Sequence, residues 1–185
     1  MRKISSFNFV TLNGYFKGNN EDTSWHHHSQ EGSAYSEKQL ESGNILLFGR
    51  VTYDMMAQFW TGKMGKELYP VVAGRMNAAE KMVISNSITT ASWNNTSVIG
   101  GDVIQRIRII KQTPGPDITI LGSGSIVNQF TEAGLIDEYG VMIDPVFITT
   151  GTPLVHGIST MPELRLTGVK TFSDTGAVLL SYSKK

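Results

Sequence analysis

The feature of the sequence that most constrains the fold is a repeated alternation between short β-rich runs and amphipathic helical segments. The runs at residues 45–48, 97–99 and 118–121 each enter a turn of small or polar residues, then a segment with apolar residues at helical spacing. A run at residues 3–10 enters a similar turn at residues 11–14. Such alternation requires crossover connections, so it predicts a largely parallel sheet with its turns at the carboxyl ends of the strands.

The last third of the chain has a different pattern. Residues 138–147 read as one long strand, and residues 164–171 and 177–183 flank the turn at residues 173–176 as a hairpin. We therefore expect an α/β fold with a mixed, mostly parallel sheet, antiparallel C-terminal strands and helices on both faces. No linker divides the chain, which predicts a single domain over residues 1–185. The long connections, the usual location of binding loops, are expected at residues 17–36 and 61–80.

Charge and composition exclude several classes of function. The 16 basic and 16 acidic side chains leave no net charge and form no basic stripe, which disfavours nucleic-acid and anionic-membrane partners. The chain has no cysteine, so disulfides and thiolate metal sites are excluded. No apolar run is long enough to span a bilayer, and the N-terminal segment lacks the apolar core of a signal peptide. We expect a cytoplasmic protein without nucleic-acid or membrane partners.

The turn Gly122-Ser123-Gly124-Ser125 joins a strand to a helix and is a candidate anion site. The first N–H groups of a helix point outward at such a turn, and glycine lets a phosphate approach the backbone closely. However, Val127 stands where the dinucleotide fingerprint requires its third glycine, and no Gly-Lys-Ser/Thr sequence follows. Taken alone, the turn is equally typical of a tight corner that binds nothing.

A second corner, Gly49-Arg50-Val51-Thr52, is more informative. Arginine offers a bidentate fork to a phosphate, and a threonine at a helix start both caps the helix and contacts anions. An exposed arginine and an ordinary helix cap remain the alternative interpretation. Two such corners in one parallel sheet favour a dinucleotide, which has more than one phosphate, and Ser85-Asn86-Ser87 offers hydroxyls and an amide to a third.

A series of short motifs runs along the chain from about residue 3 to residue 157. They are Thr11-Leu12-Asn13-Gly14-Tyr15-Phe16, Leu46-Leu47-Phe48-Gly49-Arg50-Val51-Thr52-Tyr53, Met76-Asn77 with Lys81-Met82-Val83-Ile84-Ser85, Leu121-Gly122-Ser123-Gly124-Ser125, Leu135-Ile136-Asp137-Glu138, Pro145-Val146 and Gly151-Thr152-Pro153-Leu154. In this order they resemble the dihydrofolate reductase-like superfamily. The match is to the branch that contains the C-terminal reductase domain of bifunctional riboflavin-biosynthesis enzymes.

The resemblance implies a dihydrofolate reductase-like three-layer fold and an NADPH-dependent reductase of a small nitrogen heterocycle, similar to 5-amino-6-(5-phosphoribosylamino)uracil reductase. The cofactor would lie across the carboxyl ends of the strands. The residues expected to bind it are Arg50, Ser85 and Asn86 for the 2′-phosphate and adenosine, Gly49, Thr52, Gly122, Ser123, Gly124, Ser125 and Ile126 for the pyrophosphate, and Val10, Thr11, Leu12 and Phe16 for the nicotinamide.

Two residues depart from the pattern of that branch. Asn13 stands where many members have aspartate, and Ser123 replaces a glycine in a turn that carries a Gly-Gly peptide in the superfamily. An amide hydrogen-bonds a substrate but does not donate a proton as an acid at neutral pH. An alternative function is therefore an NADP(H)-binding or ligand-binding protein that keeps the scaffold without turnover.

Trp25 and His26 of the loop Trp25-His26-His27-His28 are candidates for substrate contact, together with Asn13 and Trp60. A plain exposed loop is the leading alternative. The substrate-facing role of Trp25 and His26 rests on position alone, because the loop follows the strand that would bear the nicotinamide. A metal site at His26 and His28 is the weaker alternative, because no acidic or histidine partner at suitable spacing completes it, and we predict no metal. Trp60 ends a helix, where an aromatic residue is more often core than pocket.

The stretch at residues 139–150 indicates a surface through which two copies of the chain would pair. Apolar residues at 139, 141 and 143 and again at 146–148 change faces near Pro145, as they do at a bulge or at the end of a strand. The resemblance implies an isologous homodimer with the C-terminal strands at its centre. In the alternative, helices of the same chain bury both faces of the sheet.

Overall fold

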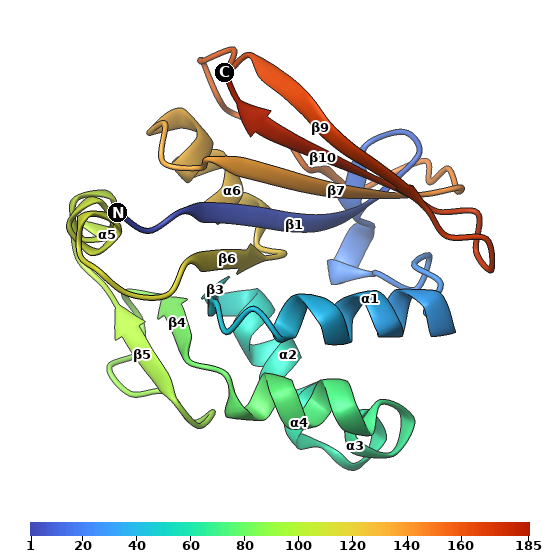
Figure 1. Ribbon diagram of the computed structural model, residues 1–185, viewed down its shortest axis with the longest axis horizontal. Coiled ribbons are helices and arrows are strands. Elements are labelled where there is room, and N and C mark those ends of the chain that lie inside the picture. The colour runs from blue at the N-terminus through green and yellow to red at the C-terminus, as the bar shows by residue number, and fades with distance from the viewer.

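The computed structural model describes residues 1–185 and contains an eight-stranded sheet in the order β5-β4-β3-β6-β1-β7-β10-β9 (Figure 1). Strands from β5 to β7 pair in parallel, and β7, β10 and β9 pair antiparallel. The strands are β1 (Ile4–Thr11), β3 (Ile45–Gly49), β4 (Lys81–Ile84), β5 (Thr96–Ile99), β6 (Ile118–Leu121), β7 (Glu138–Asp144), β9 (Leu164–Thr171) and β10 (Val178–Lys184). The predicted mixed sheet with an antiparallel C-terminal hairpin is confirmed.

Outside this sheet lie a short strand pair and the helices. The strands β2 (Tyr15–Lys17) and β8 (Thr152–Pro153) pair antiparallel beside the end of β1. The helices are η1 (Asn19–Glu21), α1 (Gln30–Leu40), α2 (Arg50–Thr61), α3 (Lys63–Leu68), α4 (Pro70–Ala78), α5 (Val103–Gln112) and α6 (Gly124–Glu132). None of them has the length and apolar character needed to cross a membrane.

Strand β3 shows why helices cover both faces of the sheet. Ile45 and Leu47 belong to a core cluster with residues of α5 and α6, whereas Leu46 and Phe48 belong to a second cluster with residues of α2 and α4. Four consecutive apolar side chains therefore become buried on alternating faces, which is typical of a central parallel strand. Burial of each such side chain contributes about 1.5–3 kcal/mol.

Two expectations about local structure were wrong in detail. The strand predicted at residues 138–147 ends at Asp144, because Pro145 has no N–H to donate to the sheet. The expected long connections contain α1, α3 and α4. Helix α1 buries none of its residues completely, so its apolar stripe was too weak to read from the sequence.

Lys81 fixes the start of β4 against the end of α4. Its side chain is completely buried, and its Nζ donates hydrogen bonds to the carbonyls of Met76 at 2.9 Å, of Asn77 and of Ala79. These are carbonyls of the last helical turn, where the helix dipole favours a cation. The Nζ atom also lies 4.7 Å from the centroid of the Trp93 ring. This contact positions β4 and therefore the loop that follows it.

Candidate functional site

The two predicted phosphate corners are neighbours in space. Strands β3 and β6 pair in parallel, so the turns after both strands lie at the same edge of the sheet. The N–H of Gly49 donates a 2.7 Å hydrogen bond to Ser123 Oγ. A Cβ on Gly49 would lie 3.1 Å from Ile126 Cγ1 and 3.2 Å from Ser123 Oγ, so the close approach favours glycine. The starts of α2 and α6 thus form one site.

Both helices begin without a side-chain cap. Gly49, which has no side chain, precedes α2, and the side chain of Ser123, which precedes α6, makes no hydrogen bond to the first turn. By contrast, Ser29 Oγ accepts from the N–H of Gly32 at the start of α1, and the Asp102 side chain accepts from the N–H of Gln105 in α5. The first turns of α2 and α6 therefore keep N–H groups for an external acceptor, and an anion is the acceptor that suits them.

The turn between β6 and α6 has an unusual backbone. Gly122 and Ser123 both adopt the left-handed conformation, with φ of 61° and 58°. A non-glycine residue is strained there, and Ser123 is held by its hydrogen bond to Gly49. Thr52 packs on this turn, with its Cγ2 3.1 Å from the place of a Cβ on Gly122. The serine that departs from the expected glycine is thus the residue that joins the two corners.

Arg50 extends from the start of α2 to the loop after β4. Its Nε donates to Asp54 Oδ2 at 2.6 Å, and its Nη1 donates to Ser87 Oγ at 3.3 Å. The hydroxyls of Ser87 and Ser85 lie 3.0 Å apart. A guanidinium and two hydroxyls are therefore collected at the ends of β3 and β4. Ser87 was not among the residues predicted to bind the cofactor, although it belongs to the tripeptide Ser85-Asn86-Ser87 that contains two of them.

Asn86 has a structural partner within this loop. Its Oδ1 accepts a 2.7 Å hydrogen bond from the N–H of Gly101, which ties the loop after β4 to the loop after β5. A Cβ on Gly100 would come within 3.1 Å of the same Oδ1 atom. The side chain of Asn86 therefore positions Ser85 and Ser87.

The end of β1 forms a hydrogen-bonded turn around Asn13. The hydroxyl of Thr11 donates to Asn13 Oδ1 at 2.8 Å and accepts from the N–H of Tyr15 at 3.0 Å. Asn13 Nδ2 donates to the carbonyl of Ile148 at 2.8 Å. A carboxylate has no N–H for that carbonyl, so the amide stabilises the turn in a way that aspartate does not. Leu12 lies on the outside of the turn and is 54% exposed.

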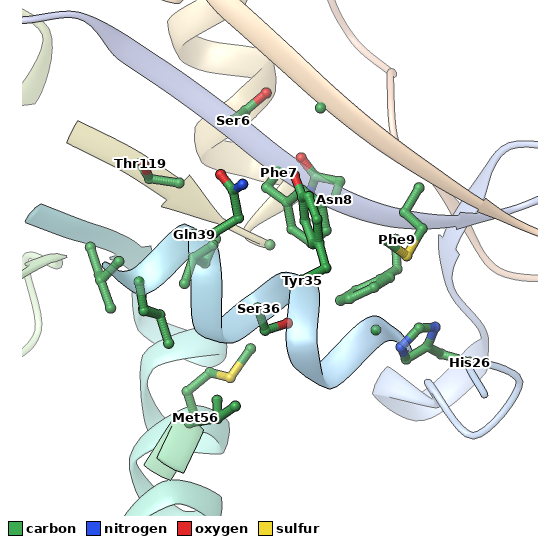
Figure 2. A pocket seen from close by; sticks show the side chains of 18 of the residues that line it. Ser6, Phe7, Asn8, Phe9, His26, Tyr35, Ser36, Gln39, Met56 and Thr119 are labelled. Carbon is green, nitrogen blue, oxygen red and sulfur yellow. The ribbon is translucent and has the colours of Figure 1, made fainter. Parts of the chain in front are cut away.

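A groove of about 1160 Å³ lies along the face of the sheet beneath α1 (Figure 2). Tyr35 and Gln39 of α1 face Phe7 and Thr119 of the strands across it. A single small-molecule pocket typically measures about 300–1000 Å³, so this groove has room for part of a cofactor and a second molecule. It brings together seven of the predicted site residues, namely Phe16, Thr52, Gly122, Ser123, Trp25, His26 and Trp60.

The other predicted residues lie outside the walls of the groove. Val10 and Ile126 are buried, and Ile126 packs in the core, so only their backbones are available to a ligand. Phe16 ring carbons lie 2.7 and 2.8 Å from the place of a Cβ on Gly124, which is why this first helical position tolerates only glycine. The remaining ones surround the strand ends or the turn after β1, namely Thr11, Leu12, Asn13, Gly49, Arg50, Ser85, Asn86 and Ser125.

The three aromatic candidates for substrate contact differ in their surroundings. Trp25 is 7% exposed, and its Nε1 is buried without a hydrogen-bond partner. Trp60 packs against Phe59 and Tyr69 and its Nε1 donates to Met56 Sδ, so it lies between the core and the groove. His26 stacks on Phe9, with ring centroids 3.8 Å apart.

His26 also has a carboxylate partner that sequence reasoning missed. Its Nδ1 lies 3.0 and 3.1 Å from the two oxygens of Asp144, whose side chain is completely buried. Burial, and then the neighbouring His26, lowers the pKa of His28. No three histidine, aspartate or glutamate side chains come close enough to hold a metal ion. The available signal for Asp144 was a carboxylate that directly follows the apolar residues 141–143 of β7.

Residues 2–178 match the family described as the RibD C-terminal domain. Among its relatives, the protein YyaP of Bacillus subtilis (strain 168) is 27% identical over 177 residues, which cover 94% of this chain and 90% of YyaP. The protein YwjB of the same organism is 38% identical over 73 residues, which cover 40% of this chain and 41% of YwjB.

Solved structures agree with the fold over the whole chain. A protein assigned to riboflavin biosynthesis in Shewanella sp. PV-4 superimposes with a TM-score of 0.75 at 18% identity, covering 100% of this chain and 99% of the other. For a pyrimidine reductase-like protein of Corynebacterium diphtheriae NCTC, the TM-score is 0.63 at 13% identity, with coverage of 100% and 92%.

A third structure is a diaminohydroxyphosphoribosylaminopyrimidine deaminase/5-amino-6-(5-phosphoribosylamino)uracil reductase of Thermotoga maritima. It superimposes with a TM-score of 0.69 at 13% identity, and this chain, covered at 100%, spans 57% of its length. At these identities the structures show the fold alone.

The family match extends over nearly the whole sequence and confirms the relationship expected from the motifs: the chain belongs to the RibD C-terminal domain family.

Proposed function

We propose that the protein is an NADPH-dependent oxidoreductase that reduces a small nitrogen heterocycle. The observation that carries the proposal is the pair of uncapped helix starts, α2 and α6, which the Gly49–Ser123 hydrogen bond joins at the edge of the sheet. A dinucleotide carries a pyrophosphate, and two adjacent sets of free N–H groups suit its negative charge. Membership of the family supports the same function.

The residues around these helix starts fit the other parts of the cofactor. The guanidinium of Arg50 and the hydroxyls of Ser85 and Ser87 suit a 2′-phosphate, since arginine pairs with phosphate through charge-assisted hydrogen bonds. Phe16 packs on the first turn of α6 and lines the groove, so it suits the nicotinamide end. The bound cofactor would supply a hydride, and the groove would orient the acceptor and exclude water.

The groove beneath α1 suits a planar heterocycle as the substrate. Phe7, Phe9 and Tyr35 line it with aromatic surface, and such rings stack well on planar molecules. The Thermotoga maritima relative is named as a reductase of 5-amino-6-(5-phosphoribosylamino)uracil, and the Corynebacterium diphtheriae relative as pyrimidine reductase-like. A pyrimidine or pterin ring is therefore the substrate class that we propose.

The test is a reductase assay with NADPH and a panel that contains 5-amino-6-(5-phosphoribosylamino)uracil, dihydrofolate and simpler aminopyrimidines. We expect the absorbance of reduced nicotinamide to fall in the presence of at least one of these compounds. It should not fall with any of them when the protein is omitted. A Phe9→Ala variant should raise KM for that substrate and leave NADPH affinity unchanged. Absence of NADPH binding and of consumption with the whole panel would contradict the proposal.

A second candidate is a binding protein that holds NADP(H) or another ligand without turnover. Its basis is Asn13, whose amide is committed to the turn by its hydrogen bond to Ile148 and supplies no acid. This candidate predicts saturable NADPH binding together with no consumption across the panel. Consumption of NADPH with any substrate excludes it.

We also propose that two copies of the chain form an isologous homodimer through the C-terminal strands, and that the protein is cytoplasmic. β9 is an edge strand, and its Leu166 and Val169 are 51% and 59% exposed. An exposed edge with large apolar side chains is a surface that proteins usually cover. A two-fold contact covers the same strand in both copies.

A further inference from the structure

A histidine lies in the wall of the groove at one end, and a buried carboxylate contacts it from behind. The side chain of Asp144 is 0% exposed and that of His26 is 13% exposed. Both oxygens of Asp144 lie within 3.0–3.1 Å of His26 Nδ1, and no other side chain donates to them. A buried carboxylate needs a donor, so Asp144 fixes the proton of the imidazole on Nδ1.

This arrangement leaves the other ring nitrogen available. His26 Nε2 has no hydrogen-bond partner in the protein and is not among the buried polar atoms without a partner. His26 belongs to the wall of the groove, and Figure 2 shows its ring beside Phe9 at one end. The open nitrogen is therefore accessible from the groove, while Asp144 holds the opposite side of the ring.

The position of the pair along the sheet places it beside the proposed nicotinamide end. Strands β1 and β7 pair in parallel, with Thr11 opposite Asp144. Phe9, on which His26 stacks, lies two residues before Thr11 and therefore on the same face of β1. The pair thus lies where β1 enters the turn around Asn13.

The other titratable groups near this end are less suited to donate a proton. Asn13 has no acidic proton, and Glu21 is paired with Lys17. Burial raises the pKa of Tyr35 above its ordinary value. The charged or titratable side chains facing His26 are Asp144 and His28, whose ring centroid lies 4.9 Å from that of His26.

We propose that His26 is the proton donor of the reduction and that Asp144 is its positioning residue, an inference that rests on the proposed function. The bound cofactor would supply a hydride to the electrophilic carbon of a C=N or C=O group, and its nicotinamide would be oxidised as that group is reduced. The π-electron pair of that group moves to its heteroatom, which takes the proton from Nε2 of the His26 imidazolium. Neutral His26 keeps its Nδ1–H on Asp144 and regains a proton at Nε2 from water.

The kinetic test compares His26→Gln with His156→Gln, a histidine outside the groove whose Nδ1 contacts Asn128 and the carbonyl of Pro153. With a substrate that the wild type reduces, we expect His26→Gln to lower kcat by about 10²–10⁴-fold. The residual activity of His26→Gln should no longer fall at alkaline pH. The NADPH affinity of this variant should change little. An unchanged kcat in His26→Gln overturns the proposal. Failure of the wild type to bind NADPH instead overturns the proposed function.

The second test needs no substrate, and it remains informative if the His26→Gln variant does not fold. Nitrogen-15 NMR of the full-length protein reports which nitrogen of each of the 4 histidines carries the proton. We expect neutral His26 to be the Nδ1–H tautomer, and Asp144→Asn to convert part of it to Nε2–H. A neutral His26 protonated on Nε2 in the wild type contradicts the proposal. In the His26→Gln/Asp144→Asn double variant, a neutral amide pair replaces the buried charge and keeps the fold measurable.

Discussion

The backbone N–H of Gly49 donates a hydrogen bond to the hydroxyl of Ser123 at 2.7 Å, and this contact joins the start of α2 to the start of α6. Two turns that are 74 residues apart in the sequence thereby become one surface, the proposed anion site. The contact requires the left-handed backbone at Ser123, where φ is 58°. Its consequences for stability and for cofactor binding can be measured separately.

Substitution of Ser123 should separate the hydrogen bond from the backbone strain. Ser123→Ala leaves the buried N–H of Gly49 without a partner, which costs about 1–3 kcal/mol in the free energy of unfolding. Ser123→Gly loses the same hydrogen bond but relieves a left-handed conformation worth about 1–2 kcal/mol. Urea unfolding should therefore rank the wild type first, Ser123→Gly second and Ser123→Ala last. Equal stability of the two variants would show that the strain is negligible.

Gly124 and Phe16 should be energetically coupled. A Cβ at position 124 would lie 2.7 Å from the Phe16 ring, so Gly124→Ala forces the ring to move and costs about 1–3 kcal/mol. Phe16→Leu removes the opposing ring atoms and should recover part of that loss, which a double-mutant cycle detects as a coupling energy. Ser125→Ala, at the next and exposed position, is the control. Additive effects of the two substitutions would exclude the steric contact.

Glu132 should give the protein an acid-dependent contribution to stability. Hydrogen bonds from the hydroxyl of Ser159 and the backbone N–H groups of Thr160 and Ser159 lower its pKa from 4.5 to about 2. Since the folded-state pKa is depressed, this contribution is present above pH 4.5 and is lost as the pH falls towards 2. In urea unfolding, the stability gap between the wild type and Glu132→Gln should narrow over that range. A constant gap, or the same narrowing with Glu67→Gln, contradicts this account.

The C-terminal edge of the sheet should determine the oligomeric state. Light scattering coupled to size exclusion should give the mass of a dimer for the wild type at micromolar concentration. Leu166→Lys with Val169→Lys places charges on the exposed face of β9 and should give the monomer mass, whereas Ile109→Lys on α5 should leave the dimer intact. A monomeric wild type would mean that the apolar surface of β9 stays uncovered.

The fold was predictable where local pattern and long-range packing agree. Strand β3 has four consecutive apolar residues, and α2, α5 and α6 have apolar stripes at helical spacing, so each element could be assigned from its own residues. Helix α1 could not, because it lies over the groove without a fully buried residue and has no strong stripe.

The turns of the candidate site after β3 and β6 could be picked out from the sequence, but the contacts between distant side chains could not. Glycines with Arg50 and Thr52 at strand ends make these turns candidate anion sites, and the parallel pairing of β3 and β6 brings the two turns together. The contact between His26 and Asp144 spans 118 positions and exists only because β7 pairs beside β1. No local pattern encodes that order of strands, so the carboxylate partner of His26 became visible only in the folded chain.

Calorimetric titration of NADPH into the wild type and Arg50→Ala tests the central claim most directly, with NADH as the second ligand and Arg108→Ala as the charge-matched control. We expect saturable NADPH binding in the wild type, weaker by about tenfold or more in Arg50→Ala, since a charge-assisted contact to the 2′-phosphate is lost. NADH affinity should be nearly the same in both proteins, and Arg108→Ala should bind NADPH as the wild type does. The absence of saturable binding at millimolar NADPH, or equal affinities in the wild type and Arg50→Ala, would contradict the account.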